Sequence, residues 1–497
     1  PQLSYQFGEL PASFLPLATK QVLHHQLKIF DKLSIEKNIT IVTDADLEMI
    51  ESEYSDIGGI KLSILRIPKN IDYTLLIRKF ILPREDNDNE FIIVNDDCLP
   101  NNIPLEGNYI GLAKGTFHWR LPILHYRKNA PMYFSGLMKL RKNDFLWETF
   151  ADEDLTRIFR TLKLNKEINF LEIDGNFCIS SVIGYFKARN NYTSERSFNT
   201  LKIKDNIVTK ASDDEHKISA EAYWYENLPI QIKPYVPNYY GRHDRKRYSI
   251  EYIAALPLNE VFVYGRMPIT SWNTIFDIMK KYFTDCPKGH DDDVLTAETD
   301  LHSLLIRKTQ QRIKQVKHLD FISFDNQYML NGEPVGYLND ILEASYDSVR
   351  SLPKHFGFFH GDLCLSNIIF DPLTNSIKVY DPRGHGINKK LTVYGDQLYD
   401  LSKLAHSIIG LYDFIVAGQF ELSVHDFDFD FMIDVPQDLL DIQNMFLSKF
   451  FLCNVDTKSI LPVLPLLFLS MIPLHSDNKL RQKALFANAL RLYSLVS

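Results

Sequence analysis

The sequence predicts an α/β domain followed by an α+β domain, and three observations support this fold class. Short apolar runs at residues 39–42 and 91–94 are bounded by polar residues, which is typical of buried strands in an α/β sheet. A hairpin pattern opens the second domain. From about residue 270 the apolar positions follow helical spacing, interrupted by one strand-rich segment at 356–381.

The order of these elements places the main boundary near residue 195, which gives domains 1–195 and 196–497. In the first domain, residues 15–32 have the apolar spacing of a helix and precede both strands. The first domain is therefore predicted to alternate helices and strands.

The second domain is predicted to begin with an antiparallel hairpin that turns at Asp205 and Asn206. A basic run at 242–247 is interpreted as a solvated loop. We predict a small N-lobe of about 196–265 and a larger, mainly helical C-lobe of about 266–497. The N-lobe elements are predicted, in order, as strand 201–203, strand 207–210, helix 217–226 and strand 248–253.

The chain has 497 residues, of which 45% are hydrophobic and 24% are charged, as in folded globular proteins. Collagen, coiled-coil and largely disordered classes are therefore excluded. Lys and Arg number 55 against 63 Asp and Glu, so the net charge is −8. Nucleic-acid-binding proteins carry an overall positive footprint, and this chain does not, so no nucleic-acid partner is expected.

The five cysteines are far apart in the sequence, odd in number and form no C-x-x-C pair, which argues against a disulfide framework and a zinc site. With no basic-then-apolar signal at the start, a reducing, cytoplasmic location is expected. The most apolar stretch, 460–474, contains three prolines and is too short for a membrane span. It predicts a buried helix and turn. The oligomeric state stays open.

The clearest chemistry lies in the strand-rich segment 356–381, where a polar loop holds Asp362 and Asn367 and a hairpin leads back to Asp381. Phosphoryl transfer from ATP uses one carboxylate for the acceptor hydroxyl, and a carboxylate with an amide oxygen for Mg²⁺. Asp362 and Asn367 have the spacing of the kinase motif H-R-D-L-x-x-x-N, and Asp381 takes the place of the metal-binding Asp. The alternative is a structural turn with a capping Asp and a satisfied Asn.

Phosphate groups also need a cation that an acidic residue holds in place. Lys210 ends a predicted strand and Glu221 lies on the next helix, which is the order of the strand lysine and helix glutamate in kinases. The strand with Glu251 and Ile253 would suit a hinge whose backbone contacts an adenine. For Lys210 and Glu221, a solvated charge pair is the alternative.

Residues 197–497 resemble the aminoglycoside phosphotransferase and choline kinase group, which has a bilobal protein-kinase-like fold. His360-Gly361-Asp362 stands for His-Arg-Asp, as in that group, and residues 395–401 stand where it has G-D-x-x-x-D-L-A. The resemblance implies a kinase that uses Mg-ATP on a small hydroxylated acceptor. It implies that Asp362 is the base and that Lys210 contacts the phosphates. It also implies that Asn367 and Asp381 are the Mg²⁺ ligands. The glycine-rich loop before Lys210 is missing, so Ser197 and backbone groups would have to cover the phosphates.

Short pieces of residues 1–192 resemble sugar-phosphate nucleotidyltransferases, which have a GT-A/Rossmann-like fold. Two departures indicate a degenerate domain. Residues 2–13 lack the basic glycine-rich loop of that family, and Cys178 lies near the place of its second metal-binding Asp. Asp97 and Lys20 match family positions or are ordinary strand-end and surface charges. The pieces that carry the resemblance are 15–23, 92–97, 133–136 and 185–189.

This two-part layout resembles fusion proteins of bacterial capsule and surface-polysaccharide gene sets, which implies a sugar or polyol acceptor. Two alternatives stay open: a bifunctional sugar nucleotidyltransferase and kinase, or a catalytically inactive scaffold that binds a ligand or partner. The presence of Asp362, Asn367 and Asp381 together favours an enzyme. Arg383 and His385, just after Asp381, either face the phosphates or form a structural turn.

Overall fold

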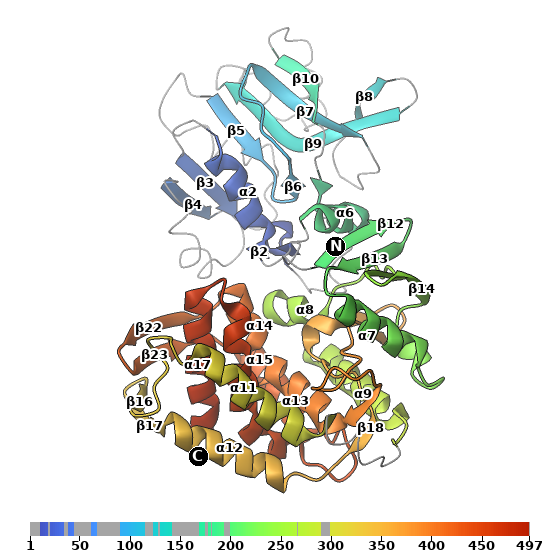
Figure 1. Cartoon of the computed structure of the whole chain (residues 1–497). Coiled ribbons are helices and arrows are strands. Elements are labelled where there is room, and N and C mark those ends of the chain that lie inside the picture. Colours follow the sequence, from blue (N-terminus) through green and yellow to red (C-terminus); the bar gives the residue numbers. More distant parts are fainter. Residues whose placement is uncertain are drawn as a thin grey trace. The chain divides into compact units, whose positions relative to one another are not determined.

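The chain divides into two compact units, Pro1–Thr193 and Ser194–Ser497 (Figure 1). The computed structural model describes residues 10–17, 20–33, 38–43, 61–66, 90–114, 123–127, 130–141, 168–173, 177–179, 181–192, 199–265, 267–289 and 299–496.

The first unit contains a mixed sheet in the order β10-β7-β9-β5, with β8 paired to β9. Strands β7 and β10 are parallel, and the remaining pairs of this sheet are antiparallel. A separate parallel pair, β3 and β4, includes the predicted strand 39–42, and β5 includes the predicted strand 91–94, so both strand positions are confirmed. The residues of both runs are half-buried and not, as predicted, buried. The bounds are β3 (Asn38–Thr43), β4 (Lys61–Arg66), β5 (Glu90–Val94), β7 (Asn108–Lys114), β8 (Ile123–Arg127), β9 (Ala130–Arg141) and β10 (Ile168–Glu172).

The helix predicted at 15–32 is wrong over its first part. Leu15 is extended, as expected for a residue that precedes proline, and the chain then forms two short paired strands before the helix begins at Val22. The elements are η1 (Ala12–Phe14), β1 (Pro16–Leu17), β2 (Lys20–Gln21) and α2 (Val22–Asp31), and later β6 (Cys98–Leu99), β11 (Phe177–Cys178) and α6 (Val182–Tyr192).

The second unit begins with an antiparallel sheet in the order β12-β13-β15-β14. Asp205 and Asn206 form the predicted turn with φ of 53° and 60°, the left-handed values that suit a tight hairpin. The basic run 242–247 is not a loop, because its first residues lie in β14. This strand is at the edge of the sheet, and none of its residues is fully buried. Strands and helix are β12 (Asn199–Lys204), β13 (Ile207–Ser212), α7 (Glu215–Glu226), β14 (Tyr239–Asp244) and β15 (Arg247–Glu251).

The rest of the second unit is mainly helical, as predicted, but it includes a small sheet that the sequence analysis missed, in the order β17-β16-β23-β22 (Figure 1). The helices are α8 (Leu258–Tyr264), α9 (Ile269–Asp285), η5 (His302–Arg307), α11 (Lys308–Val316), α12 (Leu338–Ser351), α13 (Gln397–Ile408), α14 (Tyr412–Ala417), α15 (Gln437–Ser448) and α17 (Lys479–Ser494). The strands are β16 (Gln327–Leu330), β17 (Glu333–Tyr337), β22 (Glu421–His425) and β23 (Asp428–Met432).

The apolar stretch predicted as a buried helix and turn is a core element. It runs through η7 (Thr457–Val463), α16 (Leu464–Met471) and η8 (Ile472–His475). By length and composition alone it could cross a membrane, but most of it is buried within this unit. The α16 backbone accepts hydrogen bonds from α11 at Leu466 and Ser470. The prediction of a buried helix is therefore confirmed.

Two short strand pairs frame the loop that holds Asp362 and Asn367. One pair joins β18 and β21 before and after it, and the other is the predicted hairpin of β19 and β20, which ends just before Asp381. The bounds are β18 (Phe356–Phe358), η6 (Leu365–Asn367), β19 (Ile368–Asp371), β20 (Ser376–Val379) and β21 (Tyr394–Asp396).

Gly384 fixes the approach of the segment after Asp381 to helix α7. Its φ is +68°, and a Cβ there would lie 2.0 Å from the Ala220 carbonyl oxygen. We expect Gly384→Ala to lower the free energy of unfolding by about 2–4 kcal/mol, from left-handed strain and overlap together. Gly332→Ala is the control, because Gly332 has φ +80° with nothing within 4 Å, and should cost about 1 kcal/mol. Equal losses in urea unfolding would contradict the close approach.

Candidate active site

The loop from His360 to Asn367 is held in place by a buried carboxylate on α13. The Asp400 oxygens accept hydrogen bonds from the backbone N–H groups of His360 at 2.6 Å and Gly361 at 2.8 Å. Gly361 has φ +80°, which favours glycine at this turn. Burial raises the pKa of Asp400 to about 7, and the donated N–H groups oppose that rise. Asp400 thus fixes the turn that presents the next residue, Asp362.

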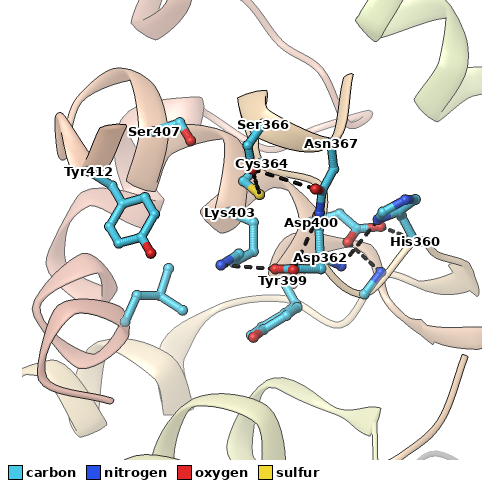
Figure 2. A network of polar contacts seen from close by, with 12 residues as sticks. His360, Asp362, Cys364, Ser366, Asn367, Tyr399, Asp400, Lys403, Ser407 and Tyr412 are labelled. Carbon is cyan, nitrogen blue, oxygen red and sulfur yellow. Dashed lines mark hydrogen bonds and ion pairs between the residues drawn. The ribbon is translucent and has the colours of Figure 1, made fainter. Parts of the chain in front are cut away.

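Asp362 lies between a cation and an amide (Figure 2). The Lys403 Nζ atom is 2.9 Å from Asp362 Oδ1, and the Asn367 amide donates to the Asp362 carbonyl at 2.9 Å. The Asp362 side chain is 46% exposed, whereas that of Lys403 is 8% exposed. Partial burial by itself would raise the pKa of Asp362, but the Lys403 ammonium outweighs it and holds that pKa well below its ordinary value. Asp362 is therefore an ionised and accessible carboxylate.

His360 connects this loop to the strand that leads to Asp381. Its Nε2 atom lies 3.0 Å from the Tyr380 carbonyl oxygen, and the Asp362 N–H donates to its Nδ1 at 3.3 Å. These partners require Nε2 to carry the proton. The ring is fully buried, and burial lowers its pKa to about 4, so it is neutral at neutral pH. His360 thus has a positioning role between the two halves of the site.

A second charged group is centred on Lys210. Its Nζ atom lies 2.9 Å from Glu221 Oε1 and 2.9 Å from Asp381 Oδ1, and the Tyr248 hydroxyl donates to Glu221 Oε2 at 2.8 Å. Burial by itself would lower the pKa of Lys210, but Asp381 and Glu221 raise it above its ordinary value. Asp381 itself has φ +58°, a left-handed conformation uncommon outside glycine that is concentrated at functional sites.

Helix α7 connects the Lys210 group to the loop. It carries Glu221 and also Trp224, whose indole N–H donates to the Phe359 carbonyl at 2.9 Å, just before His360. Asn367 is linked to the same place, because its carbonyl accepts from the Tyr380 N–H at 3.1 Å. The structure therefore brings Lys210, Glu221 and Asp381 together beside the loop that holds Asp362 and Asn367.

The remaining predicted site residues are not part of this network. Glu251 ends β15, where its carboxylate accepts from the Asn238 N–H at 3.1 Å. Ile253 follows β15 and is partly buried, and across the described ranges neither residue hydrogen-bonds to the His360–Asn367 loop. Ser197 lies outside the described residues. The predicted roles of these three in nucleotide binding stay predictions.

Asn367 and Asp381 offer an amide oxygen and a carboxylate, which is the ligand chemistry that Mg²⁺ prefers. Mg²⁺ usually takes only one or two carboxylates from the protein and completes its shell with water and substrate phosphates. The described ranges contain no group of three or more His, Cys, Asp or Glu side chains that could hold a metal by themselves. Asn367 and Asp381 are thus the side chains of this site that could hold a metal, with its other ligands coming from outside the protein.

Lys403 is the residue of this site that the sequence analysis missed. It follows Asp400 by three positions on α13, so both side chains reach the same loop from one helix face. The G-D-x-x-x-D-L-A resemblance placed Asp400 but assigned no role to Lys403. A lysine one turn beyond that second Asp was the available signal.

In the first unit, Asp97 and Cys178 lie together. The Cys178 thiol is 3.8 Å from Asp97 Oδ2. In the antiparallel pair of β6 and β11, Cys178 lies opposite Cys98 in the strand register. Lys20 is exposed at β2. All five cysteines lie in the described ranges and are free thiols. The resemblance of this unit to nucleotidyltransferases stays a prediction.

No protein-family model matches the sequence, and none of the curated proteins matches it. The solved structures similar to this chain include several kinases and phosphotransferases that act on small molecules. A choline/ethanolamine kinase family protein from Mesorhizobium loti is 10% identical, with 63% of this chain and 100% of that chain covered and a TM-score of 0.34. A GDP complex of aminoglycoside 2′-phosphotransferase-IIIa is 11% identical, with 61% and 91% covered and a TM-score of 0.38. Macrolide 2′-phosphotransferase from Brachybacterium faecium is 10% identical, with 61% and 96% covered and a TM-score of 0.34.

Proposed function

We propose that the unit Ser194–Ser497 transfers the γ-phosphoryl group of Mg-ATP to a hydroxyl of a small molecule. The observation that carries this proposal is the meeting of two charged groups, Lys210–Glu221–Asp381 and Lys403–Asp362–Asn367, through the buried ring of His360. Phosphoryl transfer needs positioned charge more than covalent chemistry from the protein, and this network supplies both signs of charge.

Each residue then has a defined task. Asp362, kept ionised by Lys403, orients the acceptor hydroxyl and takes its proton. Asn367 and Asp381 would hold Mg²⁺, which offsets phosphate charge when bound. Lys210, fixed by Glu221, contacts the phosphate oxygens once Asp381 turns to the metal. Glu251, Ile253 and Ser197 would lie along the nucleotide.

We further propose a sugar or polyol acceptor and a place in surface-polysaccharide synthesis in the cytoplasm, on the sequence resemblance alone. The five free thiols support a reducing compartment. A nucleotidyltransferase activity of the first unit remains the bifunctional alternative.

An inactive scaffold is the competing function, and the burial of charge argues against it. Lys210 and Glu221 are each 3% exposed. Removing two charges from water costs free energy that their attraction need not repay, so stability alone does not explain a buried ion pair. Asp381 is also held in a strained conformation. A chemical task explains both features, whereas a scaffold would not require them.

The test is transfer of ³²P from [γ-³²P]ATP by the full chain with Mg²⁺, against sugars, polyols, sugar acids and sugar phosphates. We expect a labelled acceptor product that disappears when EDTA is added and with Asp362→Asn. If no acceptor is labelled and Mg-ATP does not bind, the scaffold is the better account.

Lys403→Met is expected to move the acid limb of the kcat/KM profile to higher pH. Asp362 must be ionised to accept a proton, and Lys403 lowers the pKa of Asp362, so the wild type keeps activity at low pH. Without the cation that pKa rises, and activity is lost at a higher pH. Lys314→Met, an exposed change on α11, is the control. An unmoved acid limb would contradict the role of the ion pair.

A further inference from the structure

A cluster of four cations lies around Asp362. Lys308 and Arg312 are one turn apart on α11, Lys403 comes from α13, and Arg383 follows Asp381. We call Lys308, Arg312, Arg383 and Lys403 the basic cluster. It comes from three parts of the second unit, so it is not a run of neighbouring surface residues.

Helix α13 connects Lys308 to the proposed base, through one hydrogen bond and one ion pair. The Lys308 Nζ atom donates to the Tyr399 hydroxyl at 2.9 Å, and Tyr399 lies one turn before Lys403, whose ammonium is 2.9 Å from Asp362 Oδ1. Figure 2 shows Tyr399 and Lys403 on the same side of Asp362, with the Lys403–Asp362 ion pair as a dashed line.

Arg383 and Arg312 are positioned by backbone contacts. The Arg383 N–H donates to the His360 carbonyl at 2.9 Å, and a Cβ added to Gly361 would lie 2.7 Å from the Arg383 Cβ. The segment carrying Arg383 is thus packed against the loop that presents Asp362. Arg312 donates to the Ser470 carbonyl at 2.9 Å.

Positive charge in the cluster exceeds negative charge. Lys403 forms an ion pair with Asp362, but Lys308, Arg312 and Arg383 have no ion pair with any carboxylate in the part of the chain that the structure describes. Burial lowers the pKa of Lys308 well below its ordinary value, and repulsion from Arg383, Arg312 and Lys403 lowers it further. The Asp362 carboxylate opposes this lowering for both Lys308 and Arg312, but it already pairs with Lys403. Partly buried cations that outnumber the nearby carboxylates are unfavourable unless a bound anion supplies further negative charge.

The positive charge of the basic cluster acts mainly on Asp362, whereas other lysines act on Asp381. Lys403 and Lys308 are the lysines that lower the pKa of Asp362, whereas Lys210 and Lys217 have that effect on Asp381. In the proposed function, Asp381 faces the metal and the ATP phosphates, and Asp362 faces the acceptor hydroxyl. The basic cluster therefore lies where the acceptor would bind.

We infer that the acceptor carries an anionic group, a phosphate or a carboxylate, which binds to Lys308, Arg312 and Arg383 while its hydroxyl lies at Asp362. This inference rests on the proposed function. In the reaction the acceptor oxygen forms a bond to the γ-phosphorus, and the bond from that phosphorus to the bridging oxygen breaks. ADP leaves with the electron pair, and the hydroxyl proton goes to Asp362.

A binding experiment tests the inference without turnover. Calorimetry on the full chain in phosphate-free buffer compares glycerol 3-phosphate, glucose 6-phosphate, glucuronate and inorganic phosphate with glycerol and glucose. We expect at least one anionic compound to bind more tightly than its neutral counterpart. Lys308→Met and Arg383→Met, made separately, should each weaken that binding about 10–100-fold, as for the loss of a charged hydrogen bond. The exposed Lys314→Met change should leave it unaltered.

The outcomes separate the inference from the proposed function. If no anionic compound binds better than its neutral counterpart, or if both folded variants bind like wild type, the inference is wrong even when neutral sugars are phosphorylated. If anions bind at the cluster but no acceptor accepts ³²P from Mg-ATP, the proposed function is wrong and the anion site stands. Circular dichroism of each variant identifies any that fails to fold, and the other variant then decides.

Discussion

Asp362→Asn is expected to lower kcat by about 10²–10⁴-fold, the contribution usual for a positioned general base. Asparagine keeps the shape of the side chain and its contact with Asn367, but it cannot take a proton. Because the change also leaves the Lys403 ammonium, 8% exposed, without its anionic partner, circular dichroism must show that the variant is folded before the loss is assigned to chemistry. Initial rates at saturating ATP and acceptor measure it.

The same variant should bind Mg-nucleotide as the wild type does, because Asp362 does not hold the metal in this account. Titration with a non-hydrolysable ATP analogue gives that affinity. Turnover that survives in Asp362→Asn would show that another group is the base. A parallel loss of nucleotide affinity would instead place Asp362 at the metal.

Asp381→Asn has the second large expected effect, a fall in kcat/KM for ATP on the order of 10²-fold. The change removes a carboxylate that would hold Mg²⁺ and leaves Lys210 with Glu221 as its only anionic partner among the described residues. The Mg²⁺ concentration for half-maximal activity should rise in step. Kinetics at varied Mg²⁺ and constant ATP measure both quantities.

Asp347→Asn is the matched control for that experiment, since Asp347 is an exposed carboxylate on α12 that pairs with Arg350. It should leave the Mg²⁺ dependence unchanged. If Asp381→Asn also leaves that dependence unchanged, Asp381 has a structural role beside Lys210, and the metal assignment is wrong.

Local patterns predicted those parts of the second unit whose structure depends on near neighbours. The turn at Asp205 and Asn206, the helix with Glu221, and the hairpin returning to Asp381 are each set by side-chain period or turn residues within a few positions. The pairing of Lys210 with Glu221 was expected from the order of these residues in kinases, and the contact of Lys210 with Asp381 is known from the structure.

Contacts between distant segments were not predictable in this way. The parallel pair of β16 and β23 joins residues about one hundred positions apart, so no local pattern indicates it. Lys403 contacts Asp362, and Lys308 contacts Tyr399, only because the fold brings α13 and α11 to the loop. The predicted start of the first helix was wrong for a local reason, because Pro16 keeps the preceding Leu15 in an extended conformation.

Binding of ATP through Mg²⁺ underlies every role proposed for this site, and it can be measured at equilibrium on the wild-type full chain. Calorimetric titration with adenosine 5′-(β,γ-imido)triphosphate should be made with Mg²⁺ and with EDTA. We expect saturable binding with Mg²⁺ at one site and binding at least about tenfold weaker without it, since the metal offsets phosphate charge. Absence of binding, or equal binding in EDTA, would mean that this site does not hold Mg-ATP.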